Sequence, residues 1–398
     1  MKVLQVNVCC GRGSTGRIAT DLADILAEQG HECRIAYGRD TVPKRYQSIA
    51  HRIGNDWDVR FHGVKTRLLD AHGFASKSVT ARFLDWVQDY DPDIIHLHNI
   101  HGYYLQVELL FDYLKQAGKP VIWTLHDCWS YTGHCSHYDA VGCRQWQNGC
   151  HRCTQLREYP TCVGFSDVRK NYGRKRAAFT GVENMTLVTP SQWLADEVRQ
   201  SFLGDYPVQV IPNGIDLSVF HPTESDIREQ LGIPKDKPLL LGIANVWTER
   251  KGLSDLCTLA QILGASAQLV LVGLSKAQKA ALPKNIIGMM RTHNAAELAA
   301  LYTAADVFLN PTHEDNFPTT NLESLACGAP VITYRTGGSP ESLDEKSGIV
   351  VDAAPEQMAA ALPAALKLRR EDCLRRAMRF DKWQRFADYL RLYEETMK

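Results

Sequence analysis

The sequence lacks several features that would place it directly in a class. Its 398 residues contain no apolar run of about twenty residues, the length that a membrane-spanning helix requires. The segment Met1–Val8 is too short and too often interrupted by polar side chains for the core of a secretory signal. Low-complexity segments, heptads and short repeats are also missing. We therefore expect a cytoplasmic protein, and a peripheral position at the inner face of the membrane stays open.

An excess of one charge is missing as well. The chain has 45 basic and 45 acidic residues and a formal net charge of +0. No overall field attracts nucleic acid, so we expect no nucleic-acid partner. Its 44% hydrophobic and 23% charged residues are ordinary for a globular protein, and its length exceeds what one core usually supports. Two domains are therefore predicted.

Apolar strands alternate with amphipathic helices along the chain. This alternation predicts an α/β protein with parallel, doubly wound sheets. The predicted strands are 3–8, 34–37, 94–98, 121–125 and 187–189 in the first half, and 239–244, 268–272, 307–309, 331–334 and 348–351 in the second.

A turn signal separates the two series of strands. Pro212, Asn213 and Gly214 lie between the periodic regions. We predict a first domain over 1–212, a second over 213–378, and a C-terminal helical segment over 379–398. The last segment is amphipathic through Trp383, Phe386, Leu390 and Tyr393.

Two carboxylates flank a predicted junction between a loop and a helix. Pro318 suits the first helical turn, and Gly328 suits the left-handed position after the helix end. Asp315 then lies in the loop before the helix, and Glu323 lies one to two turns inside it. Unpaired N–H groups at a helix start can hold phosphate. The alternative is an ordinary helix whose acidic first turn is favoured by the helix dipole.

Two further loops follow strands at the edge where open α/β sheets bind ligands. Arg250 and Lys251 follow strand 239–244 and offer cations to a diphosphate, although a solvated basic turn is the simpler reading. Gly11, Gly13 and Gly16 form a GxGxxG pattern between a strand and a helix. A dinucleotide fold needs an acid at the tip of the second strand, and none is there. A tight turn that needs glycine for packing is the alternative.

Histidines and glycines mark other strand ends. His126 follows strand 121–125, and His98 ends strand 94–98 beside Asn99. A histidine ring there can bond a sugar hydroxyl, or it can be a satisfied polar residue at a strand end. Gly337 and Gly338 follow strand 331–334, which is the strand after the acidic motif.

Cysteine is plentiful, with 12 residues, six of them in the loop 128–162. In a reducing compartment such clustering favours metal over disulfides. The Cys150-x-x-Cys153 pair, completed by Cys135 and Cys143, matches a structural four-thiolate zinc site of unusual spacing. Uncoordinated, buried thiols are an equal alternative, with disulfides behind both.

Taken together, these motifs resemble the retaining, nucleotide-sugar-dependent glycosyltransferases of family 4. The resemblance covers the first glycine loop, His126, the "IPNGID" linker 211–216, Arg250-Lys251-Gly252 and the acidic motif. Asp315 stands where glutamate is more usual, with Glu314 adjacent, and Ala244-Asn245 replaces a Gly-Arg pair. The cysteine loop is similar to a bacterial subgroup in exopolysaccharide assembly, including colanic-acid-type polymers.

The resemblance implies the GT-B fold, in which the parallel sheets of two Rossmann-like domains face a cleft. It implies that the last helix packs back on the first domain. The implied activity moves a hexose-type sugar from a UDP- or GDP-sugar to a saccharide, with a lipid-linked acceptor left open. No metal or other cofactor is expected in catalysis, so zinc would be structural only.

The resemblance also implies roles for individual residues. Asp315 would face the donor sugar, Glu323 the ribose, and Arg250 and Lys251 the diphosphate, with His126 completing the catalytic set. The remaining donor-binding residues would be Asn245, Asn316, Phe317, Pro318, Thr319, Gly337 and Gly338, and the acceptor side would contain Gly13, Ser14, Thr15, Gly16, His98 and Asn99.

Two other functions stay open on the sequence. One is another GT-B enzyme, such as a sugar-nucleotide epimerase or a phosphorylase. The other is a non-catalytic protein that binds a nucleotide sugar. Incubation with the donor alone separates them, since an epimerase converts it, a phosphorylase requires phosphate, and a binding protein leaves it unchanged.

Overall fold

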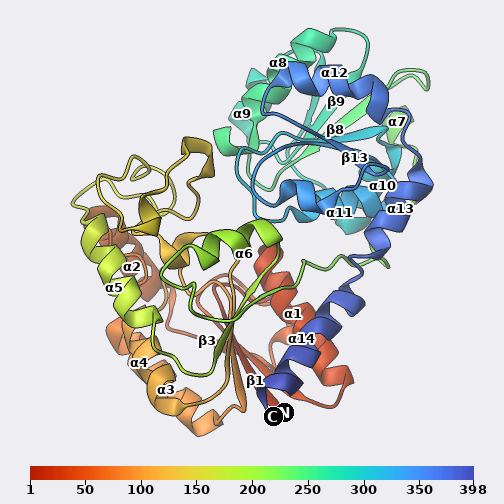
Figure 1. Cartoon of the computed structure of the whole chain (residues 1–398). Coiled ribbons are helices and arrows are strands. Elements are labelled where there is room, and N and C mark those ends of the chain that lie inside the picture. The colour runs from red at the N-terminus through yellow and green to blue at the C-terminus, as the bar shows by residue number, and fades with distance from the viewer. The chain divides into compact units, whose positions relative to one another are not determined.

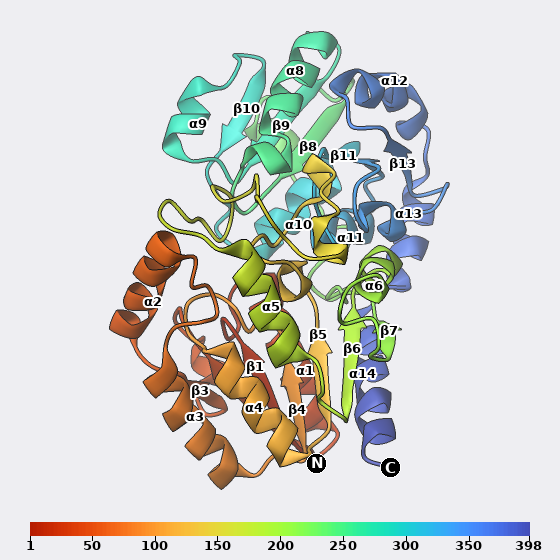
Figure 2. The same ribbon diagram turned by 60° about the vertical axis from the view of Figure 1, so that its left-hand side comes forward.

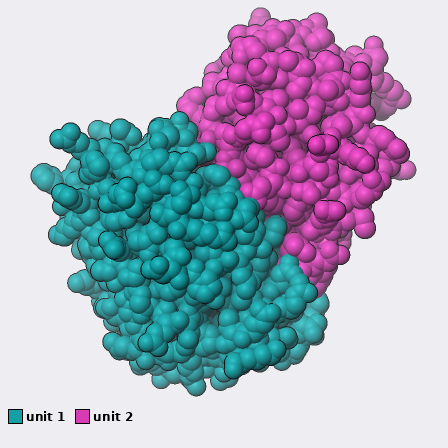
Figure 3. Space-filling view, viewed as in Figure 1, with its two compact units in different colours: residues 1–212, 386–398 teal, residues 213–385 magenta.

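The chain forms two compact units in a computed structural model that describes all residues from Met1 to Lys398 (Figures 1 and 3). The first unit contains Met1–Pro212 and Phe386–Lys398, and the second contains Asn213–Arg385. The division after Pro212 falls at the turn from which the sequence predicted a boundary. The C-terminal piece that joins the first unit begins at Phe386, seven residues later than the predicted segment 379–398.

The first unit is built on a seven-stranded sheet in the order β3-β2-β1-β4-β5-β6-β7, and every neighbouring pair is parallel. Its inner strands are apolar and buried because helices cover both faces of a doubly wound sheet (Figure 2). The strands are β1 (Lys2–Asn7), β2 (Glu32–Tyr37), β3 (Ala50–Arg52), β4 (Ile94–Leu97), β5 (Val121–Thr124), β6 (Met185–Thr189) and β7 (Val208–Val210).

The second unit has a six-stranded sheet in the order β10-β9-β8-β11-β12-β13, again parallel throughout. The predicted parallel sheets are therefore confirmed. The strands are β8 (Leu239–Ile243), β9 (Gln268–Val272), β10 (Ile286–Met289), β11 (Val307–Asn310), β12 (Val331–Tyr334) and β13 (Gly348–Val351).

Helices connect the strands of both sheets. In the first unit they are α1 (Gly13–Glu28), α2 (Asp56–Leu69), α3 (Lys77–Tyr90), α4 (Val107–Ala117), α5 (Val168–Phe179) and α6 (Gln192–Arg199). In the second they are α7 (Ile227–Gln230), α8 (Leu253–Leu263), α9 (Lys276–Ala281), α10 (Ala295–Ala304), α11 (Thr319–Ala326), α12 (Pro355–Ala365) and α13 (Arg370–Met378), followed by α14 (Lys382–Thr396). Short 3₁₀ turns are η1 (Lys44–Tyr46), η2 (Trp129–Tyr131), η3 (Asp139–Val141), η4 (Gln145–Gln147), η5 (Glu249–Lys251) and η6 (Ser339–Ser342).

Each sheet reverses its strand order once, and ligands of open α/β sheets bind at such a point. In the first unit the reversal lies between β1 and β4, and in the second between β8 and β11. The loops that leave these four strands contain the predicted glycine loop, His98, Arg250 and Asp315. The topology therefore brings the predicted residues of each unit to one edge of its sheet.

Polar side chains fasten the last helix to the first unit. Tyr393 of α14 lies 2.6 Å from His96 Nδ1, and Tyr389 lies 3.1 Å from the hydroxyl of Thr124. Thr124 in turn lies 2.8 Å from His96 Nε2, so all four side chains form one buried network. An unpaired buried polar group is costly, so this network favours the position of α14 in which every one of these groups is paired.

The structure also corrects details of the sequence reading. Strands β3, β7 and β10 were not predicted; they are three or four residues long, and Gly288 interrupts the apolar pattern of β10. Pro318 is the residue before α11, with extended backbone at ψ 116°, and not part of its first turn. No helix of the structure is both long and apolar enough to cross a bilayer.

Candidate active site

The turn after β8 presents two cations on a short 3₁₀ segment, η5. Gly252 ends this segment at φ +74°, a left-handed conformation that glycine adopts without strain. A Cβ on Gly252 would overlap the carbonyl oxygen of Pro311. Glycine at 252 thus lets the turn that holds Arg250 and Lys251 pack directly on the loop after β11.

The loop after β11 is tied to this turn through its backbone and side chains. His313 N donates to Arg250 O at 2.8 Å, and Arg250 Nη1 donates to Glu314 O at 3.0 Å. Lys251 Nζ forms an ion pair with Asp315 Oδ2. The structure therefore brings together the two predicted cations and the first predicted acid.

Glu314 and Asp315 differ in exposure. The Asp315 side chain is 20% exposed beside Lys251, whereas Glu314 as a residue is only 6% exposed. A carboxylate must reach solvent to meet a bound sugar. Asp315 meets this requirement better than its neighbour.

A second glycine turn supports the acidic loop from the other side. Gly338 N donates to Asp315 O at 3.1 Å, and a Cβ on Gly337 would overlap that same oxygen. Gly337 also has a left-handed φ of +50°. Thr336 adds a side-chain bond of 2.6 Å to Thr312 O. These contacts fix the backbone of Asp315 at the edge of the sheet, in the loop after β11.

Helix α11 begins four residues beyond Asp315 with no side-chain cap at Pro318. Its first backbone N–H groups have no partner within the helix, as at every helix start. Glu323 lies in the second turn and is buried, and Tyr302 of α10 donates to its Oε2 at 3.0 Å. Tyr302 was missed by the sequence reading, because its position in α10 carries no local motif.

The remaining predicted donor residues have different surroundings. Asn245 is exposed in the loop after β8, whereas Asn316 and Phe317 are buried before α11. Phe317 O accepts a 3.1 Å bond from Asn213 in the linker. Thr319 is half-buried as the first residue of α11.

Asn7 links several groups at the edge of the first sheet, and the sequence did not predict it as a site residue. Its Nδ2 donates to Cys9 O at 2.9 Å and lies 3.5 Å from Thr15 Oγ1. Its Oδ1 accepts from Asn99 N at 3.3 Å. The predicted residues Thr15 and Asn99 are therefore linked through one buried amide at the end of β1.

The glycine loop before α1 folds back on itself. Gly11 N donates to Gly16 O at 3.0 Å, and Gly13 is the first residue of the helix, followed by the exposed Ser14. A Cβ on Gly16 would lie 3.2 Å from Gly11 N, so the packing reading of this glycine is supported. The loop is short and leaves the start of α1 without a side-chain cap.

Hydrogen bonds determine which nitrogen of His126 carries its proton. Gln5 Nε2 donates to Ala19 O at 2.8 Å, so Gln5 Oε1 faces His98 Nε2 at 2.9 Å as an acceptor. His98 Nε2 is therefore the protonated nitrogen, and His98 Nδ1 accepts from His126 Nε2 at 3.1 Å. Burial lowers the pKa of His126 to about 4 and that of His98 well below its ordinary value. Both rings are neutral near pH 7, and His126 Nδ1 holds a lone pair.

His101 and Asp127 form a close pair beside the two histidines. Asp127 Oδ2 lies 2.9 Å from His101 Nε2. Asp127 Oδ1 accepts from Trp129 N at 2.9 Å. Burial opposes ionisation of Asp127, yet His101 brings the pKa of this carboxyl to about 2. The His126 ring contacts His98 through its Nε2.

The four cysteines of the predicted zinc site lie in one loop. Cys150 Sγ accepts from Gly133 N at 3.1 Å, and Cys153 Sγ accepts from Gln155 N at 3.4 Å. A hydrogen bond from Cys135 lowers the pKa of the Cys153 thiol. All twelve cysteines are thiols in the structure, and Cys143 is half-buried. No group of three or more possible ligands in the chain has the geometry of a metal site, so zinc stays a prediction.

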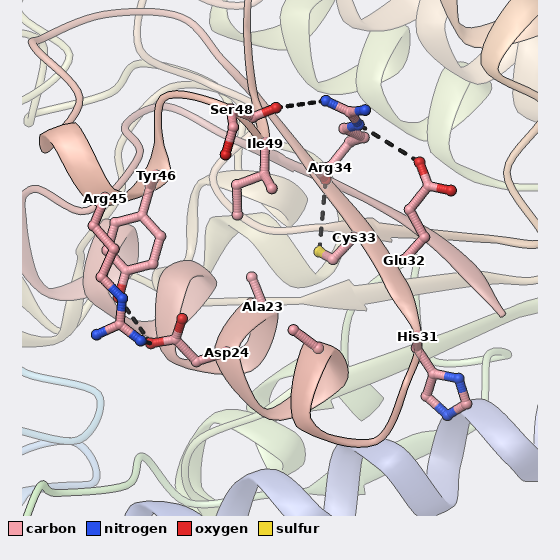
Figure 4. Close-up of a pocket in the computed structure, with 11 residues that line it drawn as sticks. Ala23, Asp24, His31, Glu32, Cys33, Arg34, Arg45, Tyr46, Ser48 and Ile49 are labelled. Carbon is pink, nitrogen blue, oxygen red and sulfur yellow. Dashed lines mark hydrogen bonds and ion pairs between the residues drawn. The ribbon is translucent and has the colours of Figure 1, made fainter.

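A separate pocket of about 440 Å³ opens at the start of β2, away from every predicted site residue (Figure 4). Its polar walls are already paired: Asp24 bonds Tyr46 at 2.8 Å and Arg45 at 3.1 Å. Arg34 donates to Ser48 O at 2.6 Å. This pocket lies at the amino end of its strand, opposite the edge where such sheets bind ligands.

Comparison with known families matches both halves of the chain. Residues 15–219 match the model of glycosyltransferase family 4, and residues 223–381 match that of glycosyl transferases group 1. The first match alone covers about half of the chain.

Individual relatives agree with these matches. The chain is 26% identical over 373 residues to WcaC of Escherichia coli K12, a glycosyl transferase assigned to colanic acid biosynthesis, covering 88% of this chain and 87% of WcaC. It is 30% identical over 204 residues to a GDP-mannose-dependent phosphatidylinositol dimannoside mannosyltransferase of Mycobacterium tuberculosis H37Ra, covering 48% and 53%. The structure of Anabaena Alr3699/HepE, solved with UDP, has a TM-score of 0.68 at 15% identity over 99% of this chain and 100% of that chain.

Proposed function

Because this chain belongs to glycosyltransferase family 4 and has the GT-B architecture of its structural relatives, we propose that it transfers a sugar from a nucleotide-diphosphate donor to a saccharide. The observation that carries this proposal is the assembly of Arg250, Lys251 and Asp315 at the edge of the second sheet, just before the start of α11. Cations, a carboxylate and uncapped N–H groups at one place suit a sugar diphosphate.

In our proposal Lys251 and Arg250 bind the diphosphate. Lys251 has three protons to donate, so it can hold Asp315 and a phosphate oxygen together. Arg250 is fixed by Glu314 O and by the backbone of His313, which orients its guanidinium before a ligand arrives. Preorganised cations of this kind stabilise the charge that the leaving nucleotide gains.

Asp315 and Glu323 contact the two ends of the donor in this proposal. Asp315 is held by Lys251 and by Gly338 N, and it faces the sugar. Glu323, with Tyr302 bonded to one carboxylate oxygen, faces the ribose. The donor is a UDP- or GDP-sugar: HepE was solved with UDP, and the mycobacterial relative is GDP-mannose-dependent.

The transfer keeps the anomeric configuration of the sugar in this proposal. The bond between the anomeric carbon and the phosphate oxygen breaks, and the acceptor oxygen forms its bond on the same face. The proton of the acceptor hydroxyl passes to the leaving phosphate, so neither a protein nucleophile nor a catalytic metal takes part. The residues of the second unit would supply charge stabilisation and orientation.

His126 serves the substrate side of the reaction. With its proton on Nε2, its Nδ1 accepts a hydrogen bond from a sugar hydroxyl. His98, Asn99 and the Gly13–Gly16 loop complete this edge of the first sheet. The acceptor is a saccharide of cell-surface polysaccharide assembly, as the similarity to WcaC supports, and we place the reaction at the cytoplasmic face of the membrane.

A thermal-shift screen of nucleotide sugars tests the proposal. The true donor should raise the melting temperature by mass action, since it binds the folded chain only. Addition of a saccharide acceptor should then yield a glycoside whose anomeric configuration, read by NMR, equals that of the donor. An inverted product would overturn retention, and an epimerised donor without acceptor would overturn transfer itself.

A further inference from the structure

Helix α2 has its apolar side chains on the outside. Trp57, Phe61, Val64 and Leu68 follow each other at steps of four, three and four residues, the spacing of one helix face. All four are exposed, Trp57 by 75% and Phe61 by 60%. Helices on a soluble surface normally bury such a face against the core.

The opposite face of α2 holds the helix to its unit through polar groups. Its two fully buried residues are His62 and Thr66. His62 Nδ1 lies 2.9 Å from Ser76 Oγ, which closes a buried polar contact. The outward position of the apolar face is thus a consequence of how the helix is attached.

A neighbouring segment extends this face beyond the end of the helix. Val163 N donates to Arg67 O at 2.8 Å, and Phe165 N donates to Leu68 O at 2.7 Å, so the segment satisfies the last carbonyls of α2. Phe165 is 84% exposed, and Val163 and Leu69 are exposed beside it. We call the seven residues the α2 face: Trp57, Phe61, Val64, Leu68, Leu69, Val163 and Phe165.

Basic side chains border the α2 face on both sides. Arg60 lies over the ring of Trp57 at 5.2 Å, and Lys65 lies over the ring of Phe61 at 4.7 Å. Arg67 is exposed on the same helix. Two acids of α2 are confined to its first turn, where Asp56 pairs with Arg52 and Asp58 closes the capping box.

This combination matches a surface for anionic lipid. A helix with aromatic and aliphatic side chains on one face and Lys or Arg at its borders lies in the headgroup region of a bilayer. Long basic side chains reach the headgroups while the apolar groups enter the acyl boundary. The net charge of the chain is +0, so the local arrangement and not a global field supplies this attraction.

A second copy of the chain suits the α2 face less well. In a symmetric pair the same patch meets itself. Arg60, Lys65 and Arg67 of the two copies would then approach one another, and like charges across an interface are costly. The exposed helix in Figure 2 lies at the outer edge of its unit. Charge complementarity therefore favours an anionic bilayer.

We propose that the α2 face docks the first unit on an anionic membrane surface. This inference rests on the proposed function only for its purpose, which is to bring the acceptor side to a lipid-linked saccharide. The docking itself requires no donor and no transfer, so the two proposals can fail separately.

Flotation with lipid vesicles tests the docking on the full chain. The wild-type protein should float with vesicles of equal parts phosphatidylcholine and phosphatidylglycerol, and much less with phosphatidylcholine alone. Added salt should weaken the binding through screening. Failure of the wild type to bind the anionic vesicles would overturn the proposal.

Two matched triple variants separate this face from general surface hydrophobicity. Trp57→Ser, Phe61→Ser and Phe165→Ser should together lower the vesicle affinity by about 10-fold or more, since each removes an inserted ring. The control variant Ile262→Ser, Met290→Ser and Met378→Ser removes exposed apolar side chains elsewhere and should bind as the wild type. Equal binding by both variants contradicts the proposal.

A spectroscopic measurement guards against a variant that misfolds. Tryptophan emission of the wild type should shift to the blue on anionic vesicles, and the single variant Trp57→Phe should lose most of that shift while still floating. Light scattering in solution tests whether a second copy of the chain binds the α2 face instead. A wild-type dimer that the triple variant converts to a monomer would assign the α2 face to protein association and overturn docking. Binding of UDP-glucose or GDP-mannose should be unchanged in the triple variant, and absence of donor binding would count against the proposed function alone.

Discussion

The sheet edge of the first unit carries neutral rings and amides beside the buried His101–Asp127 pair, whereas that of the second carries the Lys251–Asp315 ion pair and glycine turns. Of the 14 histidines, only His221, His293 and His313 belong to the second unit. Gln5, His98 and His126 form a neutral relay in the first unit, while Lys251 and Asp315 form an ion pair in the second. Neutral donors and acceptors suit hydroxyl groups, and fixed charges suit a diphosphate. One sheet design thus serves two kinds of ligand, because the loops that leave its strands differ between the units.

Low pH should give the largest difference in stability between the two units. Burial lowers the pKa of His62 and His126 to about 4 and that of His96 to about 3. A histidine with a lowered folded pKa stays neutral in the fold while the unfolded chain takes up a proton below pH 6.5. Stability is therefore full above pH 6.5 and falls as the pH drops, by about 3 kcal/mol at pH 4 for each group of pKa about 4.

Hydrogen exchange at stepwise lower pH, corrected for the intrinsic rate, measures this difference. Peptides of the first sheet should lose protection between pH 6.5 and 4, before those of the second. The second unit, which holds only three of the 14 histidines, provides the internal control for loss of protection. If the second sheet opened first, the contrast in buried histidines would not govern acid stability.

Loss of the cation at 251 should have the next largest effect, on activity alone. Lys251→Ala removes the partner of Asp315 and one charge for the diphosphate, so we expect transfer to fall by about 10²–10³-fold. Steady-state kinetics with the identified donor measures it. Lys276→Ala removes an exposed lysine of the same unit and serves as the control. Full activity of the Lys251 variant would contradict the assigned role.

Gly337→Ala tests the glycine turn of the second unit. The added Cβ would overlap Asp315 O and meet a left-handed φ, at a cost of about 2–3 kcal/mol. Gly232→Ala, in the same unit, shares a positive φ of +66° but has no atom within 4 Å of its Cβ, so it should cost only about 1 kcal/mol. Chemical denaturation gives both values. Equal costs would show that backbone strain, and not the contact with Asp315, decides.

The smallest expected effect concerns two tyrosine hydroxyls. Tyr393→Phe removes the bond to His96 and should destabilise the first unit by about 1–2 kcal/mol without changing donor affinity. Tyr302→Phe removes the bond to Glu323 and should weaken donor binding at a similar cost in stability. Thermal unfolding and donor titration of both variants check the pair. Weaker donor binding in the Tyr393 variant would contradict the assignment of donor binding to the second unit.

Local patterns in the sequence were enough to predict most strands of the two sheets. Strands such as Gln268–Val272 and Val331–Tyr334 were predicted to the residue, because buried parallel strands are continuous apolar runs. Short edge strands such as Val208–Val210 carry too few apolar residues to stand out. Their pairing with a neighbour far along the chain decides that they are strands.

The candidate site was partly predictable for the same reason. Arg250, Lys251 and Asp315 stand next to strand ends and glycine signals, so a local motif marks them. Asn7 and Tyr302 have no such marker, since only tertiary contacts with Asn99 and Glu323 give them a role. The outward apolar face of α2 was also invisible, because periodicity shows that a helix has two faces but not which face is buried.

Hydrogen exchange with and without UDP-glucose, and with and without GDP-mannose, tests the donor site most directly. We predict that the donor the protein uses will slow exchange in three segments of the second unit, 249–252, 311–323 and 335–338, and that Lys251→Ala will abolish this protection. Protection that leaves those three segments unchanged, or that persists in the Lys251 variant, would contradict the account.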